Sequence, residues 1–203
     1  MAQSAVDICN MALDYLNVRN ITSLDEDTKE SQKCNVWYDT VRKSLLTNLN
    51  ASFSIKRATL AEYADYVPVY GYGKAYVLPH DLLQVLNIGN PIQDILYQIE
   101  GRYFYCDEAI ERVDIRYIAD IKDVTEFDAD FCDCFALKLA EKICLSLTED
   151  LEKIQLIKQL AAQRYIEAST KYGRDNRITV INKPRYRGAK IIDENFNFNY
   201  PIR

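Results

Sequence analysis

The chain has 203 residues, of which 48% are hydrophobic and 27% are charged, and its formal net charge is −5. These proportions are those of a globular protein, and they exclude collagen and wholesale disorder. No apolar run approaches the roughly 18 residues that a membrane span requires. Residues 1–7 carry no basic segment typical of a secretory signal. We therefore expect one domain with an appendage, on the cytosolic side of the membrane unless it leaves by a route that needs no signal.

Cysteine and histidine usage limits the chemistry that the sequence predicts. Five of the six cysteines fall within helical apolar patterns, which favours reduced, buried thiols over disulfides. His80 is the only histidine, and no nucleophile motif or glycine-rich phosphate-binding motif accompanies it. We expect no catalytic residue, no metal and no cofactor. The cysteines are Cys9, Cys34, Cys106, Cys132, Cys134 and Cys144.

Helical spacing of apolar residues predicts four helices. Ser4 and Asp7 form a capping signal for the first helix, and Asn17 is a candidate left-handed residue at its end. Asp128 is expected to cap the third helix and Gly173 to end the fourth. Because the connection between them is short, the last two helices should run antiparallel. The predicted helices cover residues 4–16, 28–49, 128–147 and 151–172.

The apolar stripes of these helices predict which side chains face water. In the second helix, four basic residues lie off the stripe and should be exposed. In the fourth helix, Leu151 is expected to face inward. The four basic residues are Lys29, Lys33, Arg42 and Lys43.

Between the two pairs of helices, alternating residues predict an antiparallel β region over residues 76–120, with one face in water and a hairpin turn at Glu100–Gly101. Residues 51–76 break this pattern and are interpreted as a long, tyrosine-rich loop. Such a loop is either functional or a cover for the core, because tyrosine buries its ring and keeps its hydroxyl wet. The fold class is thus α+β, an antiparallel bundle of about four helices with an inserted small antiparallel β-sheet and an extended C-terminal arm.

Charge is distributed unevenly along the chain. Residues 172–203 hold seven Lys/Arg against three Asp/Glu, which leaves 18 against 27 in the rest. The basic residues are interspersed with apolar ones, which favours docking on an acidic protein surface over binding nucleic acid. Residues 195–200 alternate strictly, as in a strand that adds to another sheet edge or folds back on its own sheet. The expected docking residues are Arg177, Lys183, Arg185, Tyr186, Arg187, Lys190, Phe196, Phe198 and Tyr200.

Several segments resemble, in order and spacing, the tail tubular protein A and head-to-tail adaptor family of short-tailed bacteriophages. The resemblance covers about residues 4–172. Asn17 stands where the family usually has Gly, and Phe53 takes the place of a Trp. The segments are Met11–Asp25, Cys34, Tyr38-Asp39, Arg42, Leu45-Leu46, Phe53–Leu60, Tyr76-Val-Leu78-Pro79-His-Asp81, Tyr117–Asp128, Leu139-Ala140 and Leu147-Thr148.

The resemblance implies a non-enzymatic virion protein, made in the host cytoplasm, that assembles as a dodecameric ring. Residues 1–172 would form the adaptor body, and residues 173–203 a docking arm on the portal protein. A downstream tail protein would bind below, and genomic DNA would pass through the ring without specific binding. No membrane is involved. The expected contacts between subunits, or with the tail, are Tyr63, Tyr66, Tyr70, Tyr72, Tyr103 and Tyr105.

Two other functions stay open at this point. A tail-associated peptidoglycan hydrolase needs a carboxylic acid in a cleft with a raised pKa, and Glu100, Glu108 and Glu111 are available. A nucleic-acid-binding module that uses the basic C-terminal segment would show a steep salt dependence of its DNA affinity.

Overall fold

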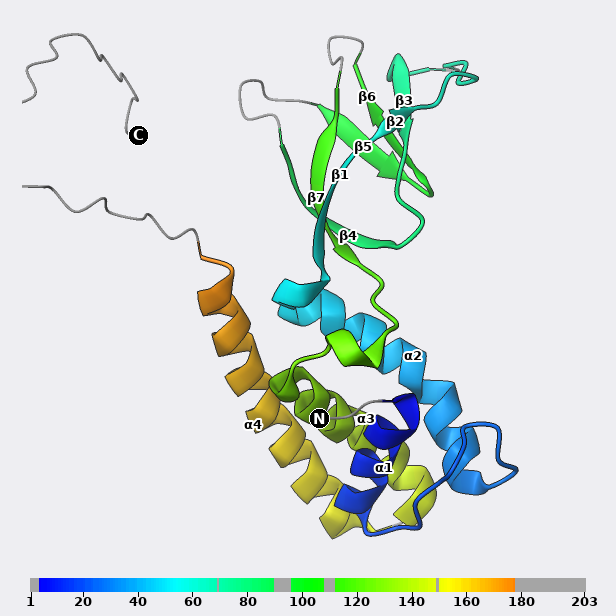
Figure 1. Ribbon diagram of the computed structural model, residues 1–203, viewed down its shortest axis with the longest axis vertical. Coiled ribbons are helices and arrows are strands. Elements are labelled where there is room, and N and C mark those ends of the chain that lie inside the picture. The colour runs from blue at the N-terminus through cyan, green and yellow to red at the C-terminus, as the bar shows by residue number, and fades with distance from the viewer. Residues whose placement is uncertain (1–3, 69, 90–95, 108–111, 149, 178–203) are drawn as a thin grey trace, which may run out of the picture.

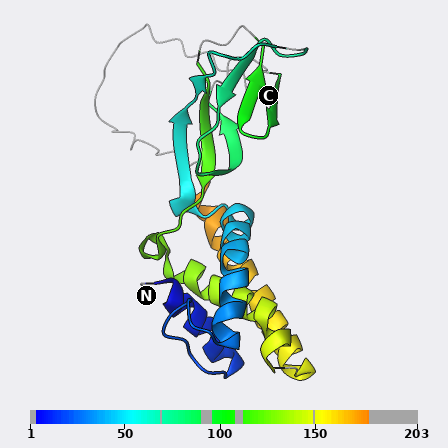
Figure 2. The same ribbon diagram turned by 90° about the vertical axis from the view of Figure 1, so that its right-hand side faces the viewer.

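The computed structural model describes residues 4–68, 70–89, 96–107, 112–148 and 150–177. Within these ranges the chain forms four α-helices and two small antiparallel sheets, so the predicted α+β class is confirmed. Figure 1 shows the helices at one end of the long axis and the strands at the other, and Figure 2 shows the same division from the side. None of the helices in the described ranges has the length and apolar content needed to cross a bilayer.

The first two helices begin and end where local signals predict. Helix α1 spans Ala5–Leu16 and helix α2 spans Lys29–Leu49. The Ser4 side chain accepts a hydrogen bond from the backbone of Asp7, and the Asp7 carboxylate accepts one from Ser4, which completes the capping box. Asn17 has φ 53° and ψ 46°, the left-handed conformation predicted for the residue that ends this helix. These hydrogen bonds join residues only a few positions apart, so they set the helix ends independently of tertiary packing.

The last two helices are α3 (Ala129–Thr148) and α4 (Leu151–Asp175). The backbone N–H of Phe131 donates to Asp128 Oδ1 at 2.8 Å, which confirms the predicted cap. The prediction that Gly173 ends α4 is wrong, because the helix continues through Gly173 to Asp175. Tyr172 is fully buried, and this packing outweighs the roughly 1 kcal/mol that a glycine costs inside a helix.

Helix α3 is the centre of the helical part, because it packs against each of the other three helices. Its buried residues lie on all sides of the helix, as expected for an element enclosed by others. The ring of Phe53 packs edge to face with that of Phe131, at 5.1 Å between centroids, and lies tilted against that of Phe127, at 5.6 Å. All six cysteines are buried and free, as predicted.

Ion pairs tie the end of α4 to the start of α3. Lys171 Nζ lies 2.7 Å from Asp130 Oδ2 and 3.2 Å from Asp128 Oδ2, and the Tyr172 hydroxyl donates to Asp128 at 2.7 Å. Arg164 also reaches Asp130, at 3.0 Å. The last turn of one helix therefore lies beside the first turn of the other, which confirms that they are antiparallel.

These contacts predict a specific loss of stability in acid. The hydrogen bond from Lys171 holds the pKa of Asp130 below its ordinary value of 3.8, and the charge of Arg164 adds to this. A depressed carboxyl pKa stabilises the fold above the ordinary value, and that contribution is lost as the pH falls through the folded-state pKa. Asp130→Asn should therefore cost about 0.5–1 kcal/mol at pH 7 and progressively less as the pH falls below the ordinary carboxyl value. Urea denaturation across pH measures this, and Asp25→Asn, at an exposed loop residue, is the control. A difference between wild type and Asp130→Asn that stays constant down to pH 2 would contradict the assignment.

The strands form two sheets instead of the one expected. The first sheet has the order β1–β7–β4, with β1 at Ile55–Thr59, β7 at Asp114–Ala119 and β4 at Leu82–Ile88. The second has the order β2–β3–β6–β5, with β2 at Ala61–Glu62, β3 at Lys74–Val77, β6 at Tyr103–Cys106 and β5 at Tyr97–Glu100. All pairs are antiparallel, and Gly101 at φ 58° forms the predicted hairpin turn between β5 and β6.

The expected long loop over residues 51–76 is wrong in its first part, where β1 and β2 lie, and in its last three residues, where β3 begins at Lys74; the β region begins at Ile55. Strand β1 pairs along its whole length with β7, from Ile55 opposite Ile118 to Thr59 opposite Asp114. The two adjacent cations Lys56 and Arg57 hide the alternation in the sequence. The strand is therefore specified by its distant partner more than by its own residues.

The two sheets are connected directly through the chain at Leu60. Strand β1 leads through Leu60 directly into β2, and the Leu60 N–H donates to the Val113 carbonyl at 2.8 Å. Buried Leu60 and Ile115 belong to the same core cluster as Phe104 of the second sheet. The chain therefore passes from the edge strand of the first sheet straight into the edge strand of the second, and each sheet buries one of its faces.

Arg42 and Leu151 contradict their predicted exposure. Arg42 is 1% exposed: its Nη1 lies 2.5 Å from both Asp120 Oδ1 and the Ile121 carbonyl, and its Nη2 lies 3.0 Å from Asp39. The guanidinium thus joins α2 to the segment that follows β7. Leu151 is 72% exposed in the first turn of α4. Among the other three cations expected in water, Lys29 and Lys43 are exposed and Lys33 is half-buried.

Candidate protein-contact surface

Four of the predicted contact tyrosines come together on the outer face of the second sheet. The ring centroids of Tyr63 and Tyr103 lie 5.2 Å apart, those of Tyr66 and Tyr105 5.4 Å apart, and those of Tyr103 and Tyr105 6.2 Å apart. We call these four residues the tyrosine face. The Tyr66 hydroxyl donates to the Tyr72 carbonyl at 3.2 Å, which places a fifth predicted residue beside them.

Strand alternation sets the direction of these rings. In β6, Phe104 and Cys106 are fully buried, whereas Tyr103 and Tyr105 between them are half-buried on the opposite side. Tyr63 directly follows β2, and its backbone N–H donates to the Ala75 carbonyl of β3 at 2.8 Å. This hydrogen bond holds the Tyr63 ring on the same face of the sheet as Tyr103. Tyr70 is separate from the cluster: it is 90% exposed, in the turn before Gly71.

The tyrosine face has the chemistry of a protein contact. Tyrosine presents a large apolar ring and a hydroxyl that needs a partner, and it is enriched at interfaces for that reason. Desolvation, with the neighbouring Tyr66 and Glu100, raises the pKa of Tyr105, so its hydroxyl stays a neutral donor. Glu100 pairs in register with Tyr103 and is exposed, as is Val77 on the other flank of Tyr103. The surface therefore combines apolar rings, hydroxyls and one carboxylate.

The position of Glu100 bears on the hydrolase hypothesis. Glu100 is exposed at the end of β5, beside the turn residue Gly101. A glycosidase acid needs a cleft and a hydrophobic surrounding to raise its pKa. The other two candidates, Glu108 and Glu111, lie outside the described residues.

A second surface, on the outer face of the first sheet, was missed by the sequence analysis. Arg57 of β1 and Arg116 of β7 are directly opposite in register. Arg112 lies beside them, with Nε 2.9 Å from Asp114 Oδ1. These three arginines line a hollow of about 600 Å³ together with Thr59, Asn87 and Asp114. We call Arg57, Arg112 and Arg116 the arginine face.

The arginine pair lacks internal compensation in the described part of the chain. Arg112 is neutralised by Asp114 and also donates to the Thr59 hydroxyl at 3.2 Å. No acidic side chain of the described residues lies within ion-pair distance of Arg57 or Arg116. Like charges directly opposite on neighbouring strands are destabilising. An anionic or π-electron-rich partner would relieve that repulsion.

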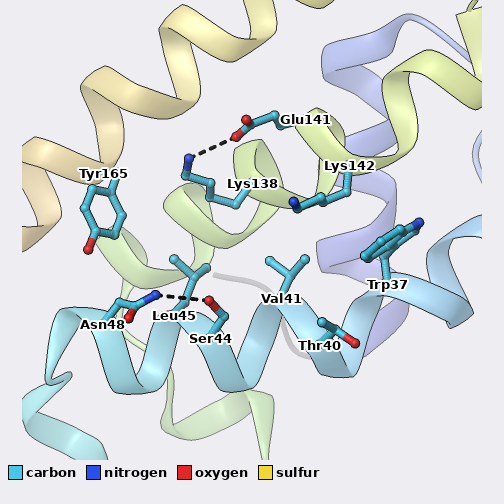
Figure 3. A pocket seen from close by; sticks show the side chains of 10 residues that line it. All are labelled: Trp37, Thr40, Val41, Ser44, Leu45, Asn48, Lys138, Glu141, Lys142 and Tyr165. Carbon is cyan, nitrogen blue, oxygen red and sulfur yellow. Dashed lines mark hydrogen bonds and ion pairs between the residues drawn. The ribbon is translucent and has the colours of Figure 1, made fainter.

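A cleft of about 380 Å³ between α2, α3 and α4 is the third surface feature (Figure 3). Trp37 and Tyr165 lie at its two ends, and the ammonium groups of Lys142 and Lys138 lie 5.7 Å from their ring centroids, respectively. Val41 and Leu45 line its α2 side, and Figure 3 shows them between the two aromatic rings. The cleft can take an apolar side chain that is flanked by a carboxylate. The sequence could not reveal it, because its residues come from three helices that only packing brings together.

Most of the predicted docking arm cannot be compared with its prediction. Arg177 is exposed just after α4 and donates its backbone N–H to the Arg174 carbonyl at 3.1 Å. The other eight arm residues, from Lys183 to Tyr200, lie outside the described residues. Asn176 caps α4 and donates its side-chain amide to the Asn50 carbonyl at 2.8 Å, which fixes the end of α4 beside the end of α2.

Metal-binding clusters and related proteins were both sought. Within the described ranges, no group of three or more His, Cys, Asp or Glu side chains is arranged to hold a metal ion. Comparison with models of known protein families and with curated proteins found no match.

Proposed function

We propose that this chain is a structural virion protein whose copies form a ring between the capsid portal and the tail of a short-tailed bacteriophage. The ring contains about twelve copies, as in the adaptors that the sequence resembles. The genome passes through its channel, and adhesion between proteins is the whole of its chemistry.

The observation that carries this proposal is the tyrosine face. Its four rings lie in contact on the outside of a sheet, where they add little to the stability of a monomer. Aromatic clusters of this kind supply most of the binding energy at many protein interfaces. The residues of the resemblance fit a shared fold, since Asp81 of the Tyr76–Asp81 segment accepts from the Tyr117 hydroxyl at 3.1 Å and pairs with Lys56 at 3.0 Å.

Each part of the chain then has a role in the proposed assembly. The four helices form an antiparallel bundle that gives the body its rigidity, with the β region inserted between its second and third helices. The arm leaves the body where α4 ends, at Asn176. Its alternating aromatics add a strand to a sheet of the portal. Net negative charge on the body keeps DNA from adhering to the channel.

Deleting residues 178–203 tests the proposal. The cut follows Asn176, so the contact of that residue with Asn50 and the end of α4 are kept. We expect a folded body with an unchanged urea midpoint whose affinity for the portal ring of the same virus falls by about a hundredfold or more. Electron microscopy of mixtures with that portal, and sedimentation, measure docking.

A matched pair of substitutions in the full chain sharpens this test. Alanine at Phe196, Phe198 and Tyr200 should abolish docking, whereas alanine at Asn195, Asn197 and Asn199 should leave most of it, because alternate residues of a strand point to opposite faces. Undiminished docking by the truncated chain would overturn the arm's role.

The hydrolase hypothesis makes a different prediction. Purified protein would clear cell-wall substrate in a zymogram, and Glu100→Gln would reduce the clearing. Such turnover would replace the structural proposal. DNA binding that falls steeply with salt and is lost with residues 178–203 would instead favour the nucleic-acid module.

A further inference from the structure

We propose that the arginine face of one copy binds the tyrosine face of a second copy, with Arg57 and Arg116 against the rings of Tyr103 and Tyr105 and near the carboxylate of Glu100. This inference rests on the proposed ring and names the surfaces that would form part of its repeated contact. It goes beyond what the resemblance implies, since the resemblance assigns no contact to Arg57, Arg112 or Arg116.

The path of the chain from β1 into β2 gives each subunit two different contact surfaces, as a heterologous contact requires. Arg57 and Thr59 of β1, then Ala61 of β2 and Tyr63, are alternate residues of one continuous stretch, so all four lie on the outer side. The sheet turns over at buried Leu60. One stretch of chain therefore contributes to both surfaces, which lie on two different sheets. A contact between two different surfaces of identical subunits is heterologous and can repeat around a ring.

The two surfaces are chemically complementary. Arg57 and Arg116 are cross-strand neighbours without an acidic partner in the described part of the chain. Guanidinium groups stack on tyrosine rings and form paired hydrogen bonds with carboxylates. The tyrosine face offers two adjacent rings 6.2 Å apart and the exposed carboxylate of Glu100 opposite Tyr103. The tyrosine face therefore offers the rings and the carboxylate that the two unpaired guanidinium groups of the arginine face can bind.

Several features favour a second copy over nucleic acid as the occupant of the arginine face. The chain carries a net charge of −5, so a polyanion is repelled at long range. Nucleic-acid affinity grows with the number of phosphates neutralised, and only two of the three arginines here lack an internal partner. The face also contains Asp114, whose pKa is lowered by the Thr59 hydrogen bond and by Arg112, so it stays anionic.

Cysteine cross-linking tests the contact directly, since all six native cysteines are buried. Asn87→Cys places a thiol in the arginine-face hollow, and Gln98→Cys places one opposite Tyr105. Under mild oxidation a mixture of the two variants should give a covalent dimer, at protein concentrations up to about 1 mM and in rings assembled on the portal. A mixture of Gln98→Cys with Val36→Cys, an exposed residue of α2, should give none.

Charge reversal tests the energetics. Arg57→Glu with Arg116→Glu should weaken self-association, measured by sedimentation velocity, by about a hundredfold. Lys29→Glu with Lys122→Glu is the control, because it changes net charge equally at exposed residues away from both faces. Mixing the arginine-reversed variant with Glu100→Arg should restore part of the association, since the opposed charges are then exchanged.

The outcomes separate this inference from the proposed function. Rings that form on the portal without the Asn87–Gln98 cross-link would overturn the inference and leave the ring proposal standing. Chains that neither self-associate nor assemble on the portal would overturn both. Arginine reversal that abolishes binding of a 20-base-pair DNA duplex, with self-association unchanged, would assign the arginine face to nucleic acid and overturn the inference. Equal association of the arginine-reversed and control variants would also refute it.

Discussion

Replacing Arg42 with methionine should lower the free energy of unfolding by about 3–5 kcal/mol, because it leaves a carboxylate and a carbonyl without their partner. The guanidinium of Arg42 is 1% exposed and binds Asp120, whose side chain is 15% exposed, at 2.5 Å. It also donates to the Ile121 carbonyl. Methionine fills a similar volume, so the loss reports the missing charge and hydrogen bonds instead of a cavity. The shift of the urea midpoint, at constant slope, measures it.

The neighbouring residue supplies a matched control. Lys43 Nζ lies 3.9 Å from the other Asp120 oxygen, but its side chain is 48% exposed. Lys43→Met should therefore cost less than about 0.5 kcal/mol. Arg42→Met combined with Asp120→Leu should recover part of the loss, because the stranded carboxylate is removed as well. If Arg42→Met proved as mild as Lys43→Met, the burial of this ion pair would be contradicted.

Arg42 also shows why helix boundaries could be predicted while side-chain environments could not. The caps at Ser4, Asn17 and Asp128 depend on atoms a few residues away, so the sequence contains the whole interaction. The partner of Arg42 is Asp120, 78 residues later. A cation one position off an apolar stripe is usually solvated, and only the segment after β7 makes this one buried.

Strand β1 shows the same limit for secondary structure. Lys56 and Arg57 give no apolar alternation, and the tyrosines that follow suggested a loop. Pairing with β7 determines this strand, and its register joins residues as far apart as Ile55 and Ile118. Local propensity is a weak guide in such a case, because cross-strand packing decides which residues form a sheet.

The two candidate faces differ in how far the sequence could reveal them. The clustering of tyrosines in the chain was visible, and Tyr63, Tyr66, Tyr103 and Tyr105 do come together. Their placement on an outer sheet face depended on the β6 hairpin, which alternation predicted. The arginine face depends on the β1–β7 register, so no inspection of the residues around Arg57 alone could have found it.

Phe131→Ala is the second substitution with a large expected effect, about 3–5 kcal/mol of unfolding free energy. The Phe131 ring is fully buried in the first turns of α3. Its centroid lies 4.9 Å from that of Phe127, 5.1 Å from that of Phe53 and 6.0 Å from that of Phe135. These rings come from three parts of the chain, so the cavity left by alanine cannot close by a shift of one element. Thermal and urea unfolding measure the loss.

Two further variants separate cavity formation from helix propensity. Phe131→Leu leaves a smaller void and should cost about 1–2 kcal/mol. Leu145→Ala, at a residue that is exposed on the same helix, should change stability by no more than about 0.5 kcal/mol, since alanine favours helix and no packing is lost. Phe53 meets the Phe131 ring edge to face, and it also lies 6.5 Å from the buried Tyr172 of α4. A Phe131→Ala loss close to that of Leu145→Ala would contradict the burial of the Phe131 ring among these aromatic residues.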